Sequence, residues 1–226
     1  MKKFTKLAAV LAATTVISTA TVFADVVAIG PKIGTQGIGI EGRAPVMENT
    51  YVRLGVNYFT YSKNFGNGNI NYKGKLTLLS APLMVDYHPF DNSGFRLSAG
   101  IAYNGNKVTI KATPSKDITI KGRTYTKDEI GSITGKVKLG NPVAALLTIG
   151  YDSSFVGQNP LSFAFEAGVM YTGSPKASVS ATGRAANGPK QKQFLADLDS
   201  DANKNFKSKS YLKFFPVLSI GVKYSF

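Results

Sequence analysis

Apolar and polar residues alternate strictly along the last residues of the chain. The apolar positions are Leu218, Ile220, Val222, Tyr224 and Phe226, and small or polar residues lie between them. Because successive side chains point to opposite faces of a strand, this segment has one apolar and one polar face. The pattern predicts a β-strand that runs to the carboxy-terminal aromatic residue.

The same alternation recurs along the chain. It predicts seven strands, at 37–43, 51–62, 77–87, 95–104, 142–151, 161–172 and 214–226. A strand that crosses a bilayer at a tilt needs about 9–11 residues. Most of these segments reach that length, so the pattern favours strands that span a membrane.

An eighth strand is expected because bacterial single-chain barrels have an even number of strands. One assignment places it at Val26–Ile33, with a tight turn at Gly34–Gly37. In the other, a single strand runs from Val27 to Arg43, and the segment 105–136 supplies the additional strand. We favour the first assignment, and we predict an all-β fold: an eight-stranded, antiparallel, up-and-down transmembrane barrel.

The connections between these strands alternate in length. The short ones are 44–50, 88–94 and 152–160, and the long ones lie near 62–73, 105–136 and 173–212. Bacterial barrels have short periplasmic turns and longer outer loops. The alternation therefore predicts that the carboxy-terminus is periplasmic and that all three long connections are outside.

The amino-terminal segment has the pattern of a secretory signal peptide. A basic stretch at 1–6 precedes an apolar run at 7–21, and Val22-Phe23-Ala24 supplies small residues for cleavage. The sequence thus predicts a signal peptide at 1–24 and a barrel at 25–226. Only helices and closed barrels satisfy every backbone polar group in hydrocarbon, which favours a barrel for this secreted chain.

The closing strand resembles that of bacterial outer-membrane β-barrels, in which terminal aromatics such as Tyr224 and Phe226 act as an insertion signal. The mature chain resembles small barrels of the OmpA, OmpX and OmpW type. The stretches 87–90, 94–100 and 173–176 are similar to a family of functionally uncharacterised outer-membrane proteins. The resemblance implies a monomer in the outer membrane of a Gram-negative bacterium, in contact with the lipid bilayer and inserted by the barrel-assembly machinery.

Four charged residues share the parity of the inward face. If the turn 44–50 is centred on Met47, Glu41 lies opposite Arg53. If the turn 88–94 is centred on Asp91, Asp86 lies opposite Arg96 by the same argument; Lys32, Glu166 and Lys223 also have inward parity. Inside a narrow barrel an unpaired charge is costly, so we expect lumen charge pairs. They act either as a plug or gate, or simply to satisfy buried polar groups in a filled interior.

The chain is strongly basic, with a formal net charge of +14, and it has no cysteine. Much of the positive charge falls in the predicted long loops. On an outer-membrane barrel the nearest anions are lipopolysaccharide phosphates, so we expect contacts with these rather than with nucleic acid. The candidate contact residues are Lys107, Lys111, Lys121, Arg123, Lys136 and Lys138.

Nothing in the sequence predicts catalysis. The single histidine, His88, precedes Pro89 in a short turn, and there is no catalytic Ser–His–acid pattern, metal-ligand spacing or glycine-rich phosphate loop. We therefore expect a non-enzymatic protein without cofactor or metal. Its expected role is structural or surface-interacting; the alternative is a narrow, porin-like channel for small or hydrophobic solutes.

Overall fold

The computed structural model describes residues 27–67, 70–114, 118–120, 123–125, 131–156, 159–182 and 210–226. The predicted signal peptide at 1–24 lies outside the described residues. Within them, no helix is long and apolar enough to cross a membrane.

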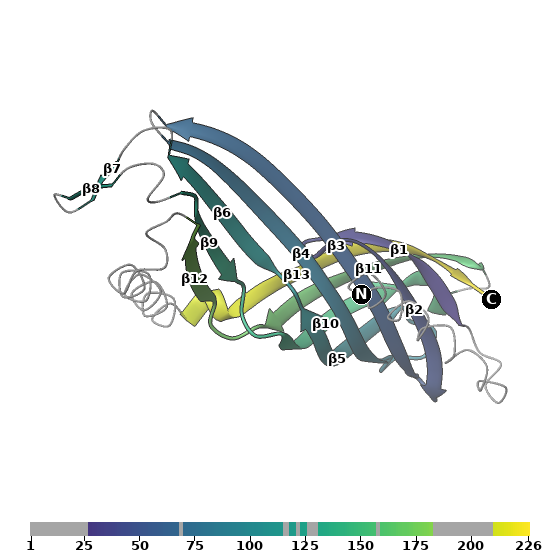
Figure 1. The fold of residues 1–226 in the computed structure, drawn as a ribbon. Helices are drawn as coiled ribbons and strands as arrows, with labels where there is room; N and C mark the ends of the chain where they lie inside the picture. The colour runs from purple at the N-terminus through teal and green to yellow at the C-terminus, as the bar shows by residue number, and fades with distance from the viewer. Residues whose placement is uncertain are drawn as a thin grey trace, which may run out of the picture.

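Eight antiparallel strands close into a barrel, which confirms the predicted fold class (Figure 1). They are β1 (Ala28–Gly34), β2 (Gly37–Met47), β3 (Thr50–Asn67), β4 (Ile70–Tyr87), β5 (Phe95–Asn104), β10 (Val143–Asp152), β11 (Leu161–Tyr171) and β13 (Phe214–Ser225). Each strand pairs with the next one in this order, and β1 pairs with β13 to complete the ring.

The eighth strand is β1, joined to β2 by the tight turn that the first assignment predicts. The alternative, one continuous strand from Val27 to Arg43, is wrong because the chain reverses at Gly37, whose φ of +107° favours glycine. Along the closing pair, the Cα partners step from Ile29↔Tyr224 to Lys32↔Gly221. Pro31, which has no N–H to donate, lies in the gap.

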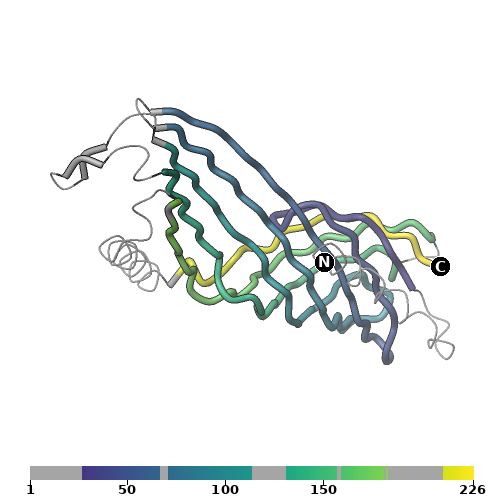
Figure 2. The backbone as a smooth tube through the Cα atoms, in the orientation of Figure 1, coloured from purple at the N-terminus to yellow at the C-terminus, as the bar shows by residue number. Residues whose placement is uncertain are grey.

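Three strands continue the barrel wall beyond its rim. They are β6 (Lys107–Pro114), β9 (Ile133–Lys138) and β12 (Lys176–Ala181), and they pair in the order β4-β6-β9-β12. Together with the far halves of β3 and β4 they form a sheet, here called the extension, which projects from the end opposite the carboxy-terminus (Figures 1 and 2). A separate small hairpin joins β7 (Ile118–Ile120) to β8 (Arg123–Tyr125).

The expectation of a long loop near 62–73 is wrong, because β3 and β4 stay paired as far as Asn67↔Ile70. The segments 105–136 and 173–212 likewise contain strands rather than loop alone. Along β4, the antiparallel register passes from Ser80↔Asn104 to Thr77↔Lys107 without a shift, so β6 continues the line of β5. The connections at 48–49 and 88–94, and the described residues 153–156 and 159–160, lie at the other end of the barrel, here called the turn end.

The outside of the barrel is apolar. Exposed side chains along it include Ile40, Val56, Leu83, Ile101, Leu147, Phe163 and Ile220, each about half exposed or more. Exposed tyrosines such as Tyr58, Tyr103 and Tyr171 accompany them. An apolar band flanked by aromatic residues is the surface that a transmembrane barrel presents to lipid, so this face contacts the bilayer.

Candidate functional site

The interior of the barrel holds a cluster of buried charges, here called the lumen network. Each member is at most 7% exposed: Lys32, Glu41, Arg43, Arg53, Asp86, Arg96, Asp152, Glu166 and Lys223. Five are cations and four are carboxylates, so positive charge is in excess by one. Every one of the eight barrel strands contributes at least one member, and β2 contributes two.

Arg53 on β3 lies at the centre of the network. Its Nε and Nη2 donate to the two carboxylate oxygens of Asp86, at 2.8 and 3.1 Å. Its Nη1 donates to Glu41 Oε2 at 3.0 Å, and Nη2 also contacts Glu166. One guanidinium thus links carboxylates from β2, β4 and β11, which lie on different sides of the lumen.

Arg96 and Lys223 complete the connection across the lumen. Arg96 pairs with Asp86 at 3.3 Å and with Glu166 at 3.1 Å. The Nζ atom of Lys223 lies 2.9 Å from an oxygen of Glu41 and 2.9 Å from an oxygen of Asp152. A continuous set of ion pairs therefore crosses the barrel.

Two further cations enter the same network. Lys32 Nζ lies 2.8 Å from Glu41 Oε2, and Arg43 Nη1 lies 2.8 Å from Asp152 Oδ2. Each of the four carboxylates consequently contacts at least two cations. This sharing satisfies buried charges that would otherwise strongly destabilise the fold.

The structure brings together both predicted residue pairs, with Glu41 and Arg53 at 3.0 Å and Asp86 and Arg96 at 3.3 Å. The predicted registers are wrong. Glu41 lies opposite Gly55, and Arg53 lies opposite Arg43.

The second hairpin is displaced in the same way, because Asp86 lies opposite Ser98 rather than Arg96. In the first hairpin Met47 pairs with Thr50, so the turn lies at 48–49 instead of being centred on Met47, and the register shifts by one residue between Pro45 and Met47. The arginines therefore reach their partners diagonally, which long side chains can do across neighbouring strands.

Sequence reasoning missed Arg43 and Asp152 as members of the network. The alternation of faces could have identified both residues. Arg43 lies two residues after Glu41 and therefore faces the same side of β2, and Asp152 is the last residue on the buried face of β10. It also missed that the bidentate partner of Arg53 is Asp86. Long-range partners across a lumen depend on how all the strands are staggered, which no local pattern specifies.

Below the network, at the turn end, three aromatic rings pack against one another. The ring of His88 lies 3.7 Å from that of Phe155 and 5.4 Å from that of Tyr51. The Arg43 guanidinium stacks over both aromatic rings, 4.3 Å from the centroid of Phe155 and 5.4 Å from that of Tyr51.

Although it lies in a short connection, His88 is only 2% exposed. Burial, reinforced by the nearby positive charge of Arg43, lowers the pKa of His88 to about 4. His88 is therefore neutral at pH 7. Asp152 helps to position the neighbouring ring of Phe155, because its side chain caps the short helical turn Ser153–Phe155.

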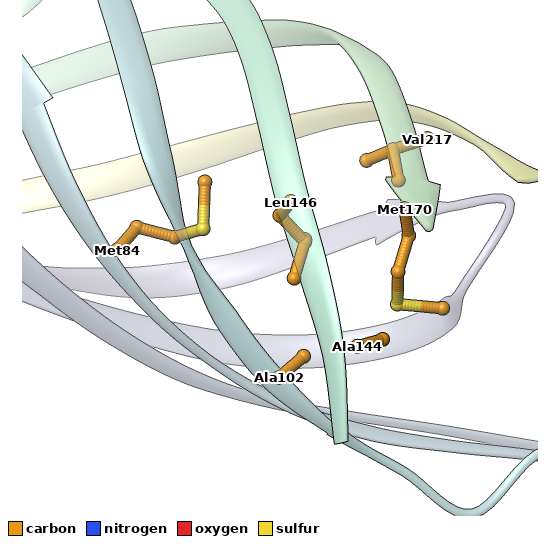
Figure 3. Close-up of a cluster of buried hydrophobic side chains, with 6 residues drawn as sticks. All are labelled: Met84, Ala102, Ala144, Leu146, Met170 and Val217. Carbon is orange, nitrogen blue, oxygen red and sulfur yellow. The ribbon is translucent and has the colours of Figure 1, made fainter. Parts of the chain in front are cut away.

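Above the network, on the side of the extension, the interior holds an apolar cluster beside buried polar side chains such as Gln36, Asn57 and Ser80. Figure 3 shows the buried cluster of Met84, Ala102, Ala144, Leu146, Met170 and Val217 in the space enclosed by the strands. Phe215 packs against this cluster. The sequence analysis did not predict this apolar cluster. Apolar residues such as Met170 at inward-facing positions of the strands could have indicated it.

Two of the remaining predicted residues lie on the outer surface of the barrel. Tyr224 and Phe226 are 49% and 77% exposed, and their rings meet edge to face at 5.1 Å. Their role as an insertion signal stays a prediction. Lys107 and Lys111 lie on β6, and Lys136 and Lys138 lie on β9. Arg123 begins β8, and Lys121 lies outside the described residues.

No protein-family model matches the chain, and no curated protein matches it either. The crystal structure of Acinetobacter baumannii CarO2 is similar, with a TM-score of 0.56 and 20% identity over 89% of this chain and 98% of that chain. A. baumannii CarO covers the same shares, with a TM-score of 0.56 and 18% identity.

A major outer membrane protein from Thermus thermophilus also covers 89% of this chain and 98% of its own, with a TM-score of 0.43 and 17% identity. Identities this low establish the fold alone. The chain thus has the fold of bacterial outer-membrane β-barrels, with an apolar outer face, a charged interior and an extension built on the far halves of β3 and β4.

Proposed function

We propose that this chain is a non-enzymatic, monomeric outer-membrane barrel of the small OmpA, OmpX and OmpW type. Its interior is closed, it serves a structural or surface-interaction role, and its basic outer residues contact lipopolysaccharide. The observation that carries the closed interior is the lumen network, in which all eight strands contribute charges that pair across the lumen.

Two further layers support closure. The aromatic floor formed by Tyr51, His88 and Phe155 lies on one side of the network. The apolar cluster around Leu146 and Met170 lies on the other, and both of these side chains are at most 5% exposed. Eight-stranded barrels are just wide enough for side chains to fill them, so these three layers of side chains support a closed interior.

The position of His88 supports a non-enzymatic role. Neither of its ring nitrogens is hydrogen-bonded to any of the described residues, and aromatic rings cover it. A general base must lie within hydrogen-bond reach of the group that it deprotonates. Within the part of the chain that the structure describes, its only histidine therefore makes no hydrogen bond to a nucleophile.

Planar-bilayer recordings of the refolded mature protein test the closed interior. We expect a current at the level of the protein-free bilayer, with heat-modifiable gel mobility demonstrating that the same preparation is folded. Reproducible stepwise conductance from the folded protein would overturn the closed interior and favour the alternative, a narrow channel for small or hydrophobic solutes.

A further inference from the structure

The two faces of the extension have opposite chemistry. One face, here called the lysine face, carries Lys73, Lys75, Lys107, Lys111, Lys136, Lys138 and Lys176, interspersed with Ser, Thr and Asn. The opposite face carries residues such as Leu76, Val108 and Val137, and its one described lysine is Lys63. Alternation along each strand produces this segregation.

Cross-strand registers place lysines directly beside one another. Lys107 on β6 lies opposite Lys138 on β9, which lies opposite Lys176 on β12. Lys73 on β4 likewise lies opposite Lys111 on β6. Neighbouring strands are only about 4.8 Å apart, and like charges directly opposite one another destabilise a sheet.

The described residues of the extension offer no compensating anion. They include no Asp or Glu on β6, β9, β12 or the far halves of β3 and β4. The lumen network shows the contrast within the same chain, because every carboxylate there contacts at least two cations. A row of lysines without internal counter-charges indicates an external anionic partner.

The position of the lysine face identifies where that partner lies. Along β4, Lys73 and Lys75 are on the same side as the lipid-facing residues Leu83 and Val85. On the β5–β6 line, Lys107 follows the exposed Tyr103 by four residues, a distance of about 13 Å along a strand. The lysine face thus begins where the apolar belt ends, which is the depth of lipid headgroups.

We propose that the lysine face binds the membrane-borne phosphates of lipopolysaccharide, with phosphates bridging lysines on neighbouring strands. This inference rests on the proposed function, in which the basic outer residues contact lipopolysaccharide, and on the predicted periplasmic position of the carboxy-terminus, which puts the extension outside. An ammonium group on a flexible stem is a strong point-charge ligand for phosphate. Continuity with the lipid-contacting wall favours phosphates anchored in the same membrane over soluble polyanions.

Binding of dye-labelled lipopolysaccharide to the refolded mature protein in zwitterionic micelles tests this proposal. The variant is Lys107→Ser with Lys138→Ser and Lys176→Ser, which removes the three-lysine row. A lysine near an anionic lipid surface contributes about fivefold in affinity, so we expect roughly a hundredfold weaker binding and a shallower dependence on salt. Heat-modifiable gel mobility verifies that the variant is folded.

Two matched single variants distinguish the effect of the lysine face from the effect of total charge. Lys138→Ser removes one lysine from the lysine face, and Lys63→Ser removes one from the opposite face of the same sheet. We expect about fivefold weaker binding for the first variant and unchanged binding for the second. Equal losses would show that total charge, rather than the lysine face, determines binding.

The remaining outcomes distinguish this inference from the proposed function. If wild type binds lipopolysaccharide and the triple variant binds it equally well, the lysine face is not the site, although the lipopolysaccharide contact stands. If wild type does not prefer phosphorylated over dephosphorylated lipopolysaccharide, the contact in the proposed function itself fails. If soluble polyphosphate binds as tightly as lipopolysaccharide, the membrane-borne source is overturned.

Discussion

The lumen network and the lysine face are both rich in cations, but the cations of the lumen are paired with carboxylates and those of the lysine face lie beside other cations. In the lumen, Arg53 contacts three carboxylates and is 2% exposed. On the extension, Lys107 and Lys138 lie opposite each other without a described acid nearby. The difference shows that burial decides whether charges must be paired, because water can solvate an exposed ammonium but not an enclosed guanidinium.

The largest expected effect comes from the centre of the network. Arg53→Met leaves Glu41, Asp86 and Glu166 short of one cation in a confined space. Breaking a buried ion pair on one side destabilises a protein by about 3–5 kcal/mol, and we expect a loss of this size in urea unfolding followed by circular dichroism. The control, Lys111→Met on the lysine face, should stay within about 0.5 kcal/mol of wild type. Equal losses for the two variants would remove the contrast between buried and exposed charges.

A smaller effect is expected at the edge of the network. Lys32→Met removes one of the three cations around Glu41, which keeps Arg53 and Lys223. We expect a loss of about 1.5–3 kcal/mol, the size of a hydrogen bond to a charged group, in the same unfolding experiment. A loss as large as that of Arg53→Met would mean that the network behaves as one indivisible unit.

The stability of the barrel interior should depend on pH in the acidic range because of His88. The pKa of this residue is about 4 in the folded protein and about 6.5 in an unfolded chain, so the unfolded chain binds the extra proton between these values. Stability is therefore complete above about pH 6.5 and falls as the pH drops toward 4. We expect His88→Phe to flatten this part of the stability profile, and an unchanged slope would show that His88 does not contribute to it.

The smallest effect is expected on the lysine face, and its sign is opposite. Lys138→Ser relieves repulsion from Lys107 and Lys176, so it should stabilise the barrel by about 0.2–1 kcal/mol at low salt when no anionic ligand is present. Thermal unfolding at low and high salt measures this gain, which should shrink at high ionic strength because salt screens exposed charges. A destabilised variant at low salt would contradict the repulsion argument.

Much of the fold could be predicted from the sequence because alternation is a local property. The strand at 95–104 coincides with β5, and the predicted 142–151 and 161–172 match β10 and β11 to within a residue. The extension escaped prediction because alternation continues there with the opposite chemistry. Lys73 and Lys75 replace apolar residues on the outer side of β4, so a search for an apolar outer face stops at Thr77.

The sequence by itself determined the period of two, and with it which side of each strand Glu41, Arg53, Asp86 and Arg96 occupy. Only the tertiary structure decided which of these charges meet. The turn at 48–49 and the register shift near Pro45 set one register, and the stagger of all eight strands brings Arg53 to Glu166 on the far wall. The face on which a side chain lies follows from the alternation of neighbouring residues. Which side chains meet across the lumen depends on the pairing of all the strands together, and no local sequence pattern specifies that pairing.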